Sequence, residues 1–116
     1  MDDAFDYVLD EVAKSALRTI DLAEDEDGNM LFLMGHILVG LCGNESDNVI
    51  AAKSLGYLRM RGFNLPDEKA KEIVISTREK CQGQVLGLQM AYNCINDFGA
   101  TGEEALASIQ QFIEVI

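Results

Sequence analysis

Residues 30–42 carry no charged side chain, and His36 is the only strongly polar residue among them. A segment this apolar has no solvent-facing side, so the rest of the chain must be arranged to cover it. As a helix it would be about 20 Å long, whereas a helix that crosses a bilayer needs about 20 residues. We therefore expect a buried central helix over residues 29–42, capped by Asn29, and no membrane span.

A buried strand is the alternative for this segment, because it is short and contains the β-branched residues Ile37 and Val39. Leucine and methionine outnumber the β-branched residues, however, and no other segment of the chain resembles a partner strand. These two observations favour the helix.

Apolar residues at helical spacing predict a helix on either side of the central one. The first begins at a cap formed by Asp2 or Asp3 and runs to about Ala23. Its inward positions are Phe5, Val8, Leu9, Val12, Ala16 and Ile20. The third helix covers about residues 45–61, with Asn44 as its cap and Gly62 as its end. Its inward positions are Val49, Ala52, Leu55, Gly56 and Met60.

A long apolar register follows Pro66, which is typical of the first turn of a helix. The register runs from Ala70 to Phe98 through Ile73, Val74, Thr77, Cys81, Val85, Leu88, Tyr92 and Ile95. It predicts either one helix of about 30 residues or two helices joined near Gln82 and Gly83, and the unbroken register favours one. Gly83 and Gly87 are spaced as in pairs that let two helices approach closely, which suggests a close crossing inside the domain.

The last predicted helix opens at Thr101, which forms a capping box with Glu104. It should extend for about 13 residues, with Ala105, Leu106, Ile109, Phe112 and Ile113 inward. The chain is therefore expected to be all-α. We predict a single domain over residues 1–116, an irregular or orthogonal bundle of about five helices around the central helix.

The charge of the chain is strongly negative and unevenly distributed. The net charge is −11, and residues 1–29 hold ten acidic side chains against Lys14 and Arg18. Such a field repels nucleic acid and anionic membranes and attracts a basic protein. Three cysteines without a paired spacing, and an acidic start unlike a signal peptide, indicate a reducing cytoplasm.

Catalytic and metal-binding patterns are not recognisable in the sequence. In the acidic run at residues 24–27, every register that places glycine correctly lacks the ligands of a calcium loop. His36 stands in an apolar run with no serine or cysteine placed as its nucleophile, which favours a core histidine. We therefore expect no cofactor, no bound metal and no enzymatic activity.

The acidic face of the first helix and the acidic run are the features with most functional content. They predict a small acidic cytoplasmic protein that binds and neutralises a basic protein partner, as an immunity or inhibitor-type protein does with a nuclease toxin. The predicted contact residues are Asp3, Asp6, Tyr7, Asp10, Glu11, Glu24, Asp25, Glu26 and Asp27. A structural or regulatory homo-oligomer, such as a homodimer, is the alternative. A mimic of DNA phosphates ranks lower, because the acidic residues crowd at one end of the chain.

Overall fold

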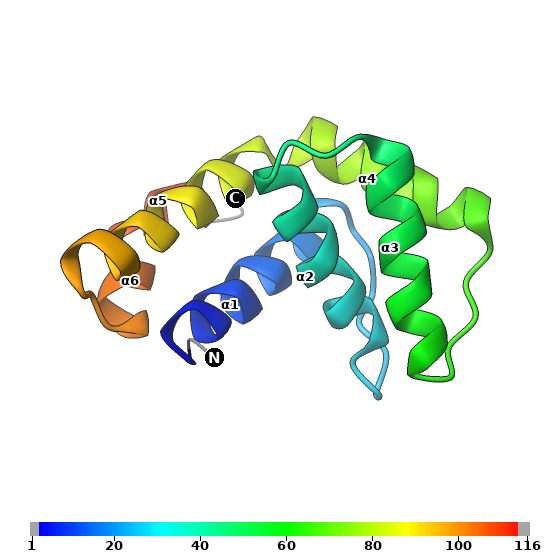
Figure 1. The fold of residues 1–116 in the computed structure, drawn as a ribbon, viewed down its shortest axis with the longest axis horizontal. Coiled ribbons are helices and arrows are strands. Elements are labelled where there is room, and N and C mark those ends of the chain that lie inside the picture. Colours follow the sequence, from blue (N-terminus) through cyan, green and yellow to red (C-terminus); the bar gives the residue numbers. More distant parts are fainter. Residues whose placement is uncertain (1–2, 114–116) are drawn as a thin grey trace.

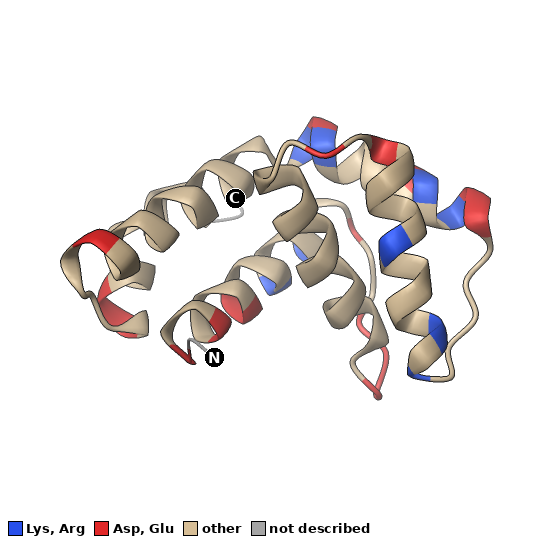
Figure 2. Cartoon of the chain, viewed as in Figure 1, with Lys and Arg blue, Asp and Glu red and all other residues tan. Residues whose placement is uncertain are grey.

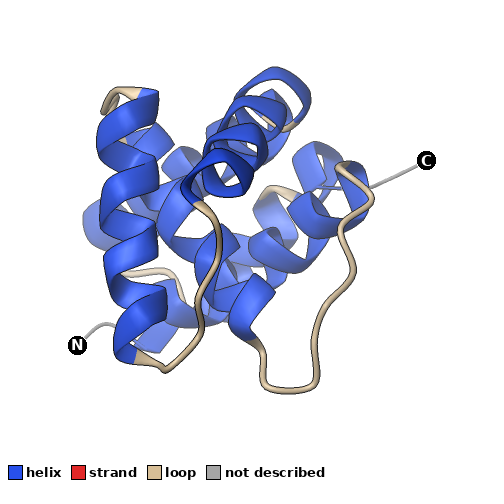
Figure 3. Ribbon diagram, turned by 90° about the vertical axis from the view of Figure 1, so that its right-hand side faces the viewer, coloured by secondary structure: helices blue, strands red, loops and turns tan. Residues whose placement is uncertain are grey.

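Seven helices and no strand make up residues 3–113, the part of the chain that the computed structural model describes (Figure 1; turned view in Figure 3). They are α1 (Asp3–Thr19), α2 (Asn29–Cys42), α3 (Asp47–Met60), α4 (Asp67–Lys80), α5 (Gln82–Phe98), α6 (Gly102–Ser108) and α7 (Gln110–Ile113). The prediction of an all-α fold is confirmed. The predicted number of five helices is wrong, because two of the predicted helices are each divided in two.

α2 lies among the other helices and contacts α1, α3, α4 and α5, in agreement with its predicted central place. Met34 and Ile37 are completely buried. The prediction that this helix has no solvent-facing side is wrong, since Val39 is 45 % exposed and Phe32 and His36 are partly exposed. One apolar stripe of α2 therefore remains open to solvent.

The acidic loop before α2 caps the N-terminus of that helix. Gly28, rather than the predicted Asn29, is the N-cap residue, and its φ of 73° lies in the left-handed region that favours glycine. The Asp25 carboxylate accepts hydrogen bonds from the Met30 backbone N–H and the Asn29 side chain, both at 2.9 Å. Asp25 thus performs the role that an N-cap side chain normally has.

α1 buries the face that its apolar spacing predicts. The buried positions are Val8, Val12 and Ala16, with Phe5, Leu9 and Ile20 packed against the core. The helix ends at Thr19, before the predicted end at about Ala23. Asp21 adopts a left-handed φ of 56°, and the Leu22 N–H bonds to the Leu17 carbonyl, which is a common helix ending. Asp2, one of the two predicted caps, lies outside the described residues.

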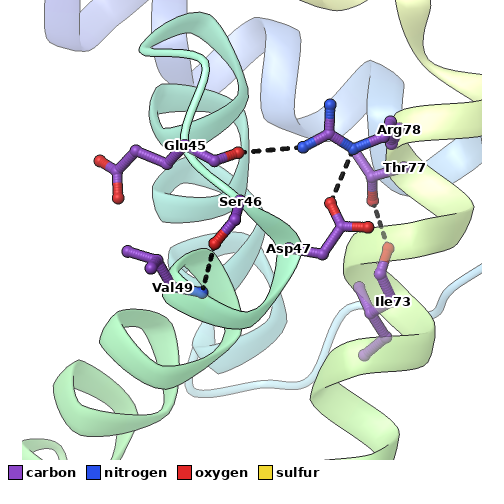
Figure 4. A network of polar contacts seen from close by, with 7 residues as sticks. All are labelled: Glu45, Ser46, Asp47, Val49, Ile73, Thr77 and Arg78. Atoms are coloured by element: carbon purple, nitrogen blue, oxygen red, sulfur yellow. Dashed lines mark hydrogen bonds and ion pairs between the residues drawn. The ribbon is translucent and has the colours of Figure 1, made fainter.

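α3 begins at a cap formed by Ser46, and not by Asn44 as predicted. The Ser46 hydroxyl oxygen accepts a hydrogen bond from the backbone N–H three residues further on (Figure 4). Beside this cap, Arg78 of α4 bonds to the Asp47 carboxylate at 2.7 Å and to the Glu45 carbonyl at 3.1 Å. The start of α3 is therefore tied to the last turn of α4.

The buried face of α3 differs from the predicted one. Of the predicted inward positions only Leu55 is buried, and Met60 is 83 % exposed. The buried positions are Ile50, Ala51, Ser54, Leu55 and Leu58. The physical reason is a close approach to α2, because a Cβ placed on Gly40 would stand 2.8 Å from Cγ1 of Ile50. This contact sets the rotation of α3 about its own axis.

The predicted long helix is divided at Cys81 into α4 and α5, so the preference for one continuous helix is wrong. A straight helix over residues 67–98 would be about 48 Å long, longer than the 40 Å longest dimension of the described chain. The break lets α4 pack on α3 while α5 packs on α1. Cys81 is itself buried, and its thiol donates to the Ala16 carbonyl at 3.8 Å.

α5 crosses α7 closely at Gly83 and Gly87. A Cβ on Gly83 would lie 3.0 Å from the carbonyl oxygen of Phe112. A Cβ on Gly87 would lie 3.0 Å from the Cβ of Phe112. The predicted close crossing inside the domain is confirmed. Tyr92 and Phe98, which were predicted inward, are 50 % and 82 % exposed. Leu88 is buried as predicted, and the buried face of α5 also includes Gln84, Gly87 and Ala91.

A buried polar network connects the first helix to the last. Nε2 of Gln84 donates to Oγ of Ser15 at 3.2 Å and to Oγ1 of Thr19 at 2.7 Å. The Ser15 hydroxyl in turn donates to the Ile113 carbonyl. Side chains from α1 and α5 thereby satisfy one another and hold the end of α7 against them.

The predicted capping box at the start of α6 is confirmed. The Glu104 N–H donates to Oγ1 of Thr101 at 3.1 Å, and the Thr101 N–H donates to the Glu104 carboxylate at 2.9 Å. The predicted last helix is interrupted by a turn at Ile109, which separates α6 from α7. The part predicted beyond residue 113 lies outside the described residues.

Candidate functional site

An open groove of about 710 Å³ lies between α1 and α2. Its floor is apolar and is formed by Phe5, Leu9 and Ala13 of α1 and by Leu31, Gly35 and Val39 of α2. The two helices are close at the centre, where a Cβ on Gly35 would stand 3.8 Å from the Leu9 side chain. The exposed stripe of α2 therefore lines this groove and is not an isolated surface.

Three carboxylates line the groove together with these apolar residues. Asp6 and Asp10 lie one turn apart on α1, and Asp27 belongs to the loop before α2. The Asp10 carboxylate pairs with Lys14 at 3.1 Å, in the i, i+4 spacing of the helix surface. Within residues 3–113, neither Asp6 nor Asp27 has a lysine or arginine within ion-pair distance of its carboxylate.

A column of three rings and one guanidinium runs beside the groove, and its members Arg61, Phe32 and His36 line the groove. The guanidinium of Arg61 lies 4.5 Å from the centre of the Phe32 ring. The rings of Phe32 and His36 meet edge to face with their centres 4.5 Å apart. The His36 ring stacks on the Tyr57 ring with their centres 4.3 Å apart. Arg61 also donates to the Asn29 side-chain oxygen at 3.1 Å and to the backbone carbonyl of residue 27 at 2.9 Å. These contacts fix the only cation that lines the groove among the described residues.

His36 is a wall residue of the groove. It was predicted to be a core residue, and this prediction is wrong because its side chain is only partly buried. Its contacts are with the faces and edges of Phe32 and Tyr57. Burial lowers the pKa of His36 below its ordinary value of 6.5, so the imidazole is neutral near pH 7. A neutral imidazole can offer a partner one hydrogen-bond donor and one acceptor.

The structure divides the nine predicted contact residues among several places. Only Asp6, Asp10 and Asp27 line the groove. Tyr7 lies on the α6 side of α1, where its ring would be 3.0 Å from a Cβ on Gly102. The others outside the groove lining are Asp3, Glu11, Glu24, Asp25 and Glu26.

Asp25 has a structural role that its predicted role in partner binding did not include. Its carboxylate is occupied by the N-terminus of α2, and the N–H of Met30 is the main cause that lowers its pKa. Reversing the charge of Asp25 would therefore damage the start of α2 together with any binding surface. Asp27, whose carboxylate is not used in this way, is the better position for a binding test.

Basic residues gather in one part of the molecule, whereas acidic residues occur throughout it. Figure 2 shows Lys and Arg mainly on α3 and α4, where Asp and Glu also occur, and a majority of Asp and Glu over Lys and Arg on α1 and in the loop before α2. Seven of the nine lysines and arginines lie within residues 53–80. Four of these seven form ion pairs, namely Lys53 with Glu45, Arg59 with Asp67, Lys69 with Glu72 and Arg78 with Asp47. The groove therefore lies in the part of the molecule with the most uncompensated negative charge.

Sequence reasoning missed the apolar half of this site. It assigned the whole of residues 30–42 to the core, so Leu31, Gly35 and Val39 were not considered as surface. The uniform apolarity of that helix was a signal, because it has two explanations. The helix can be buried on all sides by its own chain, or it can be buried on one side and bind a partner on the other. No signal pointed to Arg61, which reaches the groove from the end of α3.

The described part of the chain offers little to a metal ion, a reactive thiol or a membrane. No group of three His, Cys, Asp or Glu side chains among residues 3–113 is placed to hold a metal ion. Burial raises the pKa of the Cys42 and Cys81 thiols to about 11 in each case. None of the described helices combines the length and the apolarity that a bilayer crossing requires. No protein-family model, curated protein or solved structure matches this chain.

Proposed function

We propose that this chain is a small acidic cytoplasmic protein that binds and neutralises a basic protein partner, in the manner of an immunity or inhibitor-type protein. The observation that carries this proposal is the groove between α1 and α2, where an apolar floor lies beside Asp6, Asp10 and Asp27. An apolar surface with charged residues at its edge is the usual composition of a protein interface. The net charge of −11 favours a positively charged partner.

The proposed mechanism has two physical steps. The acidic part of the molecule first attracts the partner, and such steering raises association rates by roughly 10-fold to 1000-fold at low salt. Burial of the apolar floor then stabilises the complex, because contacts removed from water contribute most of the affinity. The bound acidic protein covers the positively charged surface that the partner needs for its own substrate, such as nucleic acid.

Affinity capture at low and high salt, followed by mass spectrometry, tests the proposal. We expect a protein with a high isoelectric point that is captured well at about 50 mM salt and less well at about 500 mM, because screening removes the electrostatic attraction and leaves the apolar contacts. The same capture is repeated with a variant that carries Asp6→Lys, Asp10→Lys and Asp27→Lys. The control carries Glu72→Lys, Glu79→Lys and Asp97→Lys. These changes alter the net charge by the same amount as in the groove variant, but they lie on α4 and α5.

The association rate of the captured protein separates specific steering from general charge. The groove variant should associate about tenfold more slowly than wild type, and the control variant much less so. Equal rates for the two variants, or retention that does not depend on salt, would refute the proposal.

A homo-oligomeric module remains the second candidate because α5 exposes apolar side chains. Leu86 and Met90, one turn apart, are 47 % and 39 % exposed, and Phe98 is 82 % exposed. Clustered exposed apolar side chains are typical of association surfaces. Light scattering at micromolar concentration distinguishes the candidates, since a monomer in solution excludes this second function.

A further inference from the structure

We infer that the groove between α1 and α2 receives one amphipathic helix of the basic partner, with its apolar face on the groove floor and its lysines or arginines beside Asp6, Asp10 and Asp27. The inference rests on the proposed function and adds to it the docking surface and the kind of segment that binds there.

A helix can lie along this groove because two neighbouring helices, α1 and α2, line it. Apolar side chains at positions i, i+3, i+4 and i+7 of a helix can enter a groove of this kind. Gly35 contributes no side chain at the centre, and only the Leu9 side chain lies within 4 Å of where its Cβ would be. Val39 is 45 % exposed beside it. The floor thus offers a shallow gap at Gly35 and exposed apolar surface to an incoming side chain.

The charges of the groove select a basic helix. Three carboxylates and one guanidinium line it. The guanidinium of Arg61 is already engaged by Phe32, Asn29 and the carbonyl of residue 27. The carboxylates of Asp6 and Asp27 have no ion pair within residues 3–113. Cations on the flanks of a bound helix would supply the missing partners, whereas an anionic segment would be repelled.

A second copy of this chain fits the groove less well. Its basic residues gather on α3 and α4, but four of the seven are already paired with carboxylates of the same region. Residues 45–80 carry six acidic side chains against those seven cations, so their sum is only +1. That surface has too little net charge to match the groove.

A designed peptide probes the groove directly. It has about 18 residues, or five helical turns, with leucines on one face and lysines on its flanks. One control peptide has the same composition with the leucines distributed around the helix, and a second carries glutamate in place of lysine. Binding is measured by fluorescence anisotropy, and the contact surface is mapped by amide chemical shifts in NMR spectra.

Two changes to the protein test the two halves of the groove. Gly35→Leu fills the floor, and Val39→Gln replaces it should the first variant not fold. Asp6→Asn, Asp10→Asn and Asp27→Asn together remove the charges, with Glu72→Gln, Glu79→Gln and Asp97→Asn as the matched control. We expect the leucine–lysine peptide to shift groove amides and to bind about tenfold more weakly to either groove variant.

The outcomes separate this inference from the proposed function. Amide shifts outside the groove, or equal binding of the glutamate peptide, overturn the inference. A captured basic protein that binds the Gly35→Leu variant as tightly as wild type also overturns it, while the proposed function stands. Peptide binding in the groove without any salt-sensitive basic partner supports the docking surface and refutes neutralisation. Concentration-dependent dimers that Gly35→Leu abolishes would assign the groove to a second copy and overturn the inference.

Discussion

Replacing Gly40 by alanine should destabilise the protein, although alanine is the better helix former. The new Cβ would stand 2.8 Å from Cγ1 of Ile50 and 3.3 Å from its Cγ2 and Cδ1. After a rotation of Ile50 about χ1, one of the two original γ positions is still filled by a γ-carbon, and β-branched side chains in helices strongly prefer one rotamer. The α2 and α3 backbones must therefore separate slightly, which loses contacts along the whole crossing.

The size of the effect follows from two opposing contributions. Overpacking a close crossing costs about 1–3 kcal/mol, and removing a glycine from a helix interior returns about 1 kcal/mol. We expect a net loss of about 1 kcal/mol. For 116 residues, an unfolding entropy of about 2.1 cal/mol/K per residue makes this a decrease in Tm of about 4 °C.

Gly56→Ala is a matched control, because Gly56 lies in α3 and a Cβ there would meet nothing within 4 Å. It should gain about 0.5–1 kcal/mol and raise Tm by about 2–4 °C. Urea unfolding followed by circular dichroism measures both variants. In the Ile50→Ala background, Gly40→Ala should become stabilising like the control. If Gly40→Ala raises the stability of the wild-type protein as much as Gly56→Ala does, the close crossing is not a constraint and the reasoning fails.

Three further predictions concern polar or titratable groups that the fold shields wholly or partly from water. Gln84→Leu should lower the free energy of unfolding by about 1–3 kcal/mol in urea titrations, because the Ser15 and Thr19 hydroxyls lose a buried hydrogen-bond donor. An unchanged urea midpoint would show that these hydrogen bonds do not stabilise the fold. The lowered pKa of His36 means that the unfolded chain binds the proton more readily, so this contribution to stability is present above about pH 6.5 and is lost as the pH falls through the lowered pKa. His36→Gln should therefore lose less Tm than wild type between about pH 7.5 and pH 5, and equal losses would show that His36 is not responsible. Cys42 and Cys81, with pKa values raised to about 11, should react with iodoacetamide at neutral pH far more slowly in the folded protein than in guanidinium, as mass spectrometry can follow; similar rates would refute their burial.

The sequence predicts those helices whose signals are local. The apolar spacing of Val8, Val12 and Ala16 identified the buried face of α1, and the capping box at Thr101 located the start of α6. The left-handed φ of 83° at Gly62 agrees with its predicted place after α3. In each case the stabilising partners lie within a few residues along the chain, so the pattern can be read without knowledge of the fold.

The sequence does not predict features that depend on distant segments. Nothing near Cys81 forces a break, and the apolar register continues through it; the break arises because α4 and α5 pack on different helices. Likewise Gln84 looks like a surface residue until Ser15 and Thr19 are brought beside it. The rotation of α3 depends on Gly40, which precedes that helix and gives no indication of which residue it faces.

For the candidate site, the charges were predictable and the surface they surround was not. Asp6, Asp10 and Asp27 were among the predicted contact residues, and their negative charge is evident from composition alone. The apolar floor was hidden because an uncovered side of α2 has the same residue types as a covered one. The open side of α2 is known only once the structure shows where α1 packs on it, beside Gly35.

The packing of α1 against the far end of the chain has a consequence for synthesis. α1 contacts α5, α6 and α7, and the bond from Ser15 to the Ile113 carbonyl joins residues 98 positions apart. At a translation rate of about 5–20 residues per second, the ribosome needs roughly 5–20 s to supply those partners. During that interval α1 can pack on α2, but the part of its apolar face that α5, α6 and α7 cover is exposed, so α1 is open to chaperones and proteases. Synonymous codons that slow translation after α4 should lengthen that exposure and reduce the yield of folded protein.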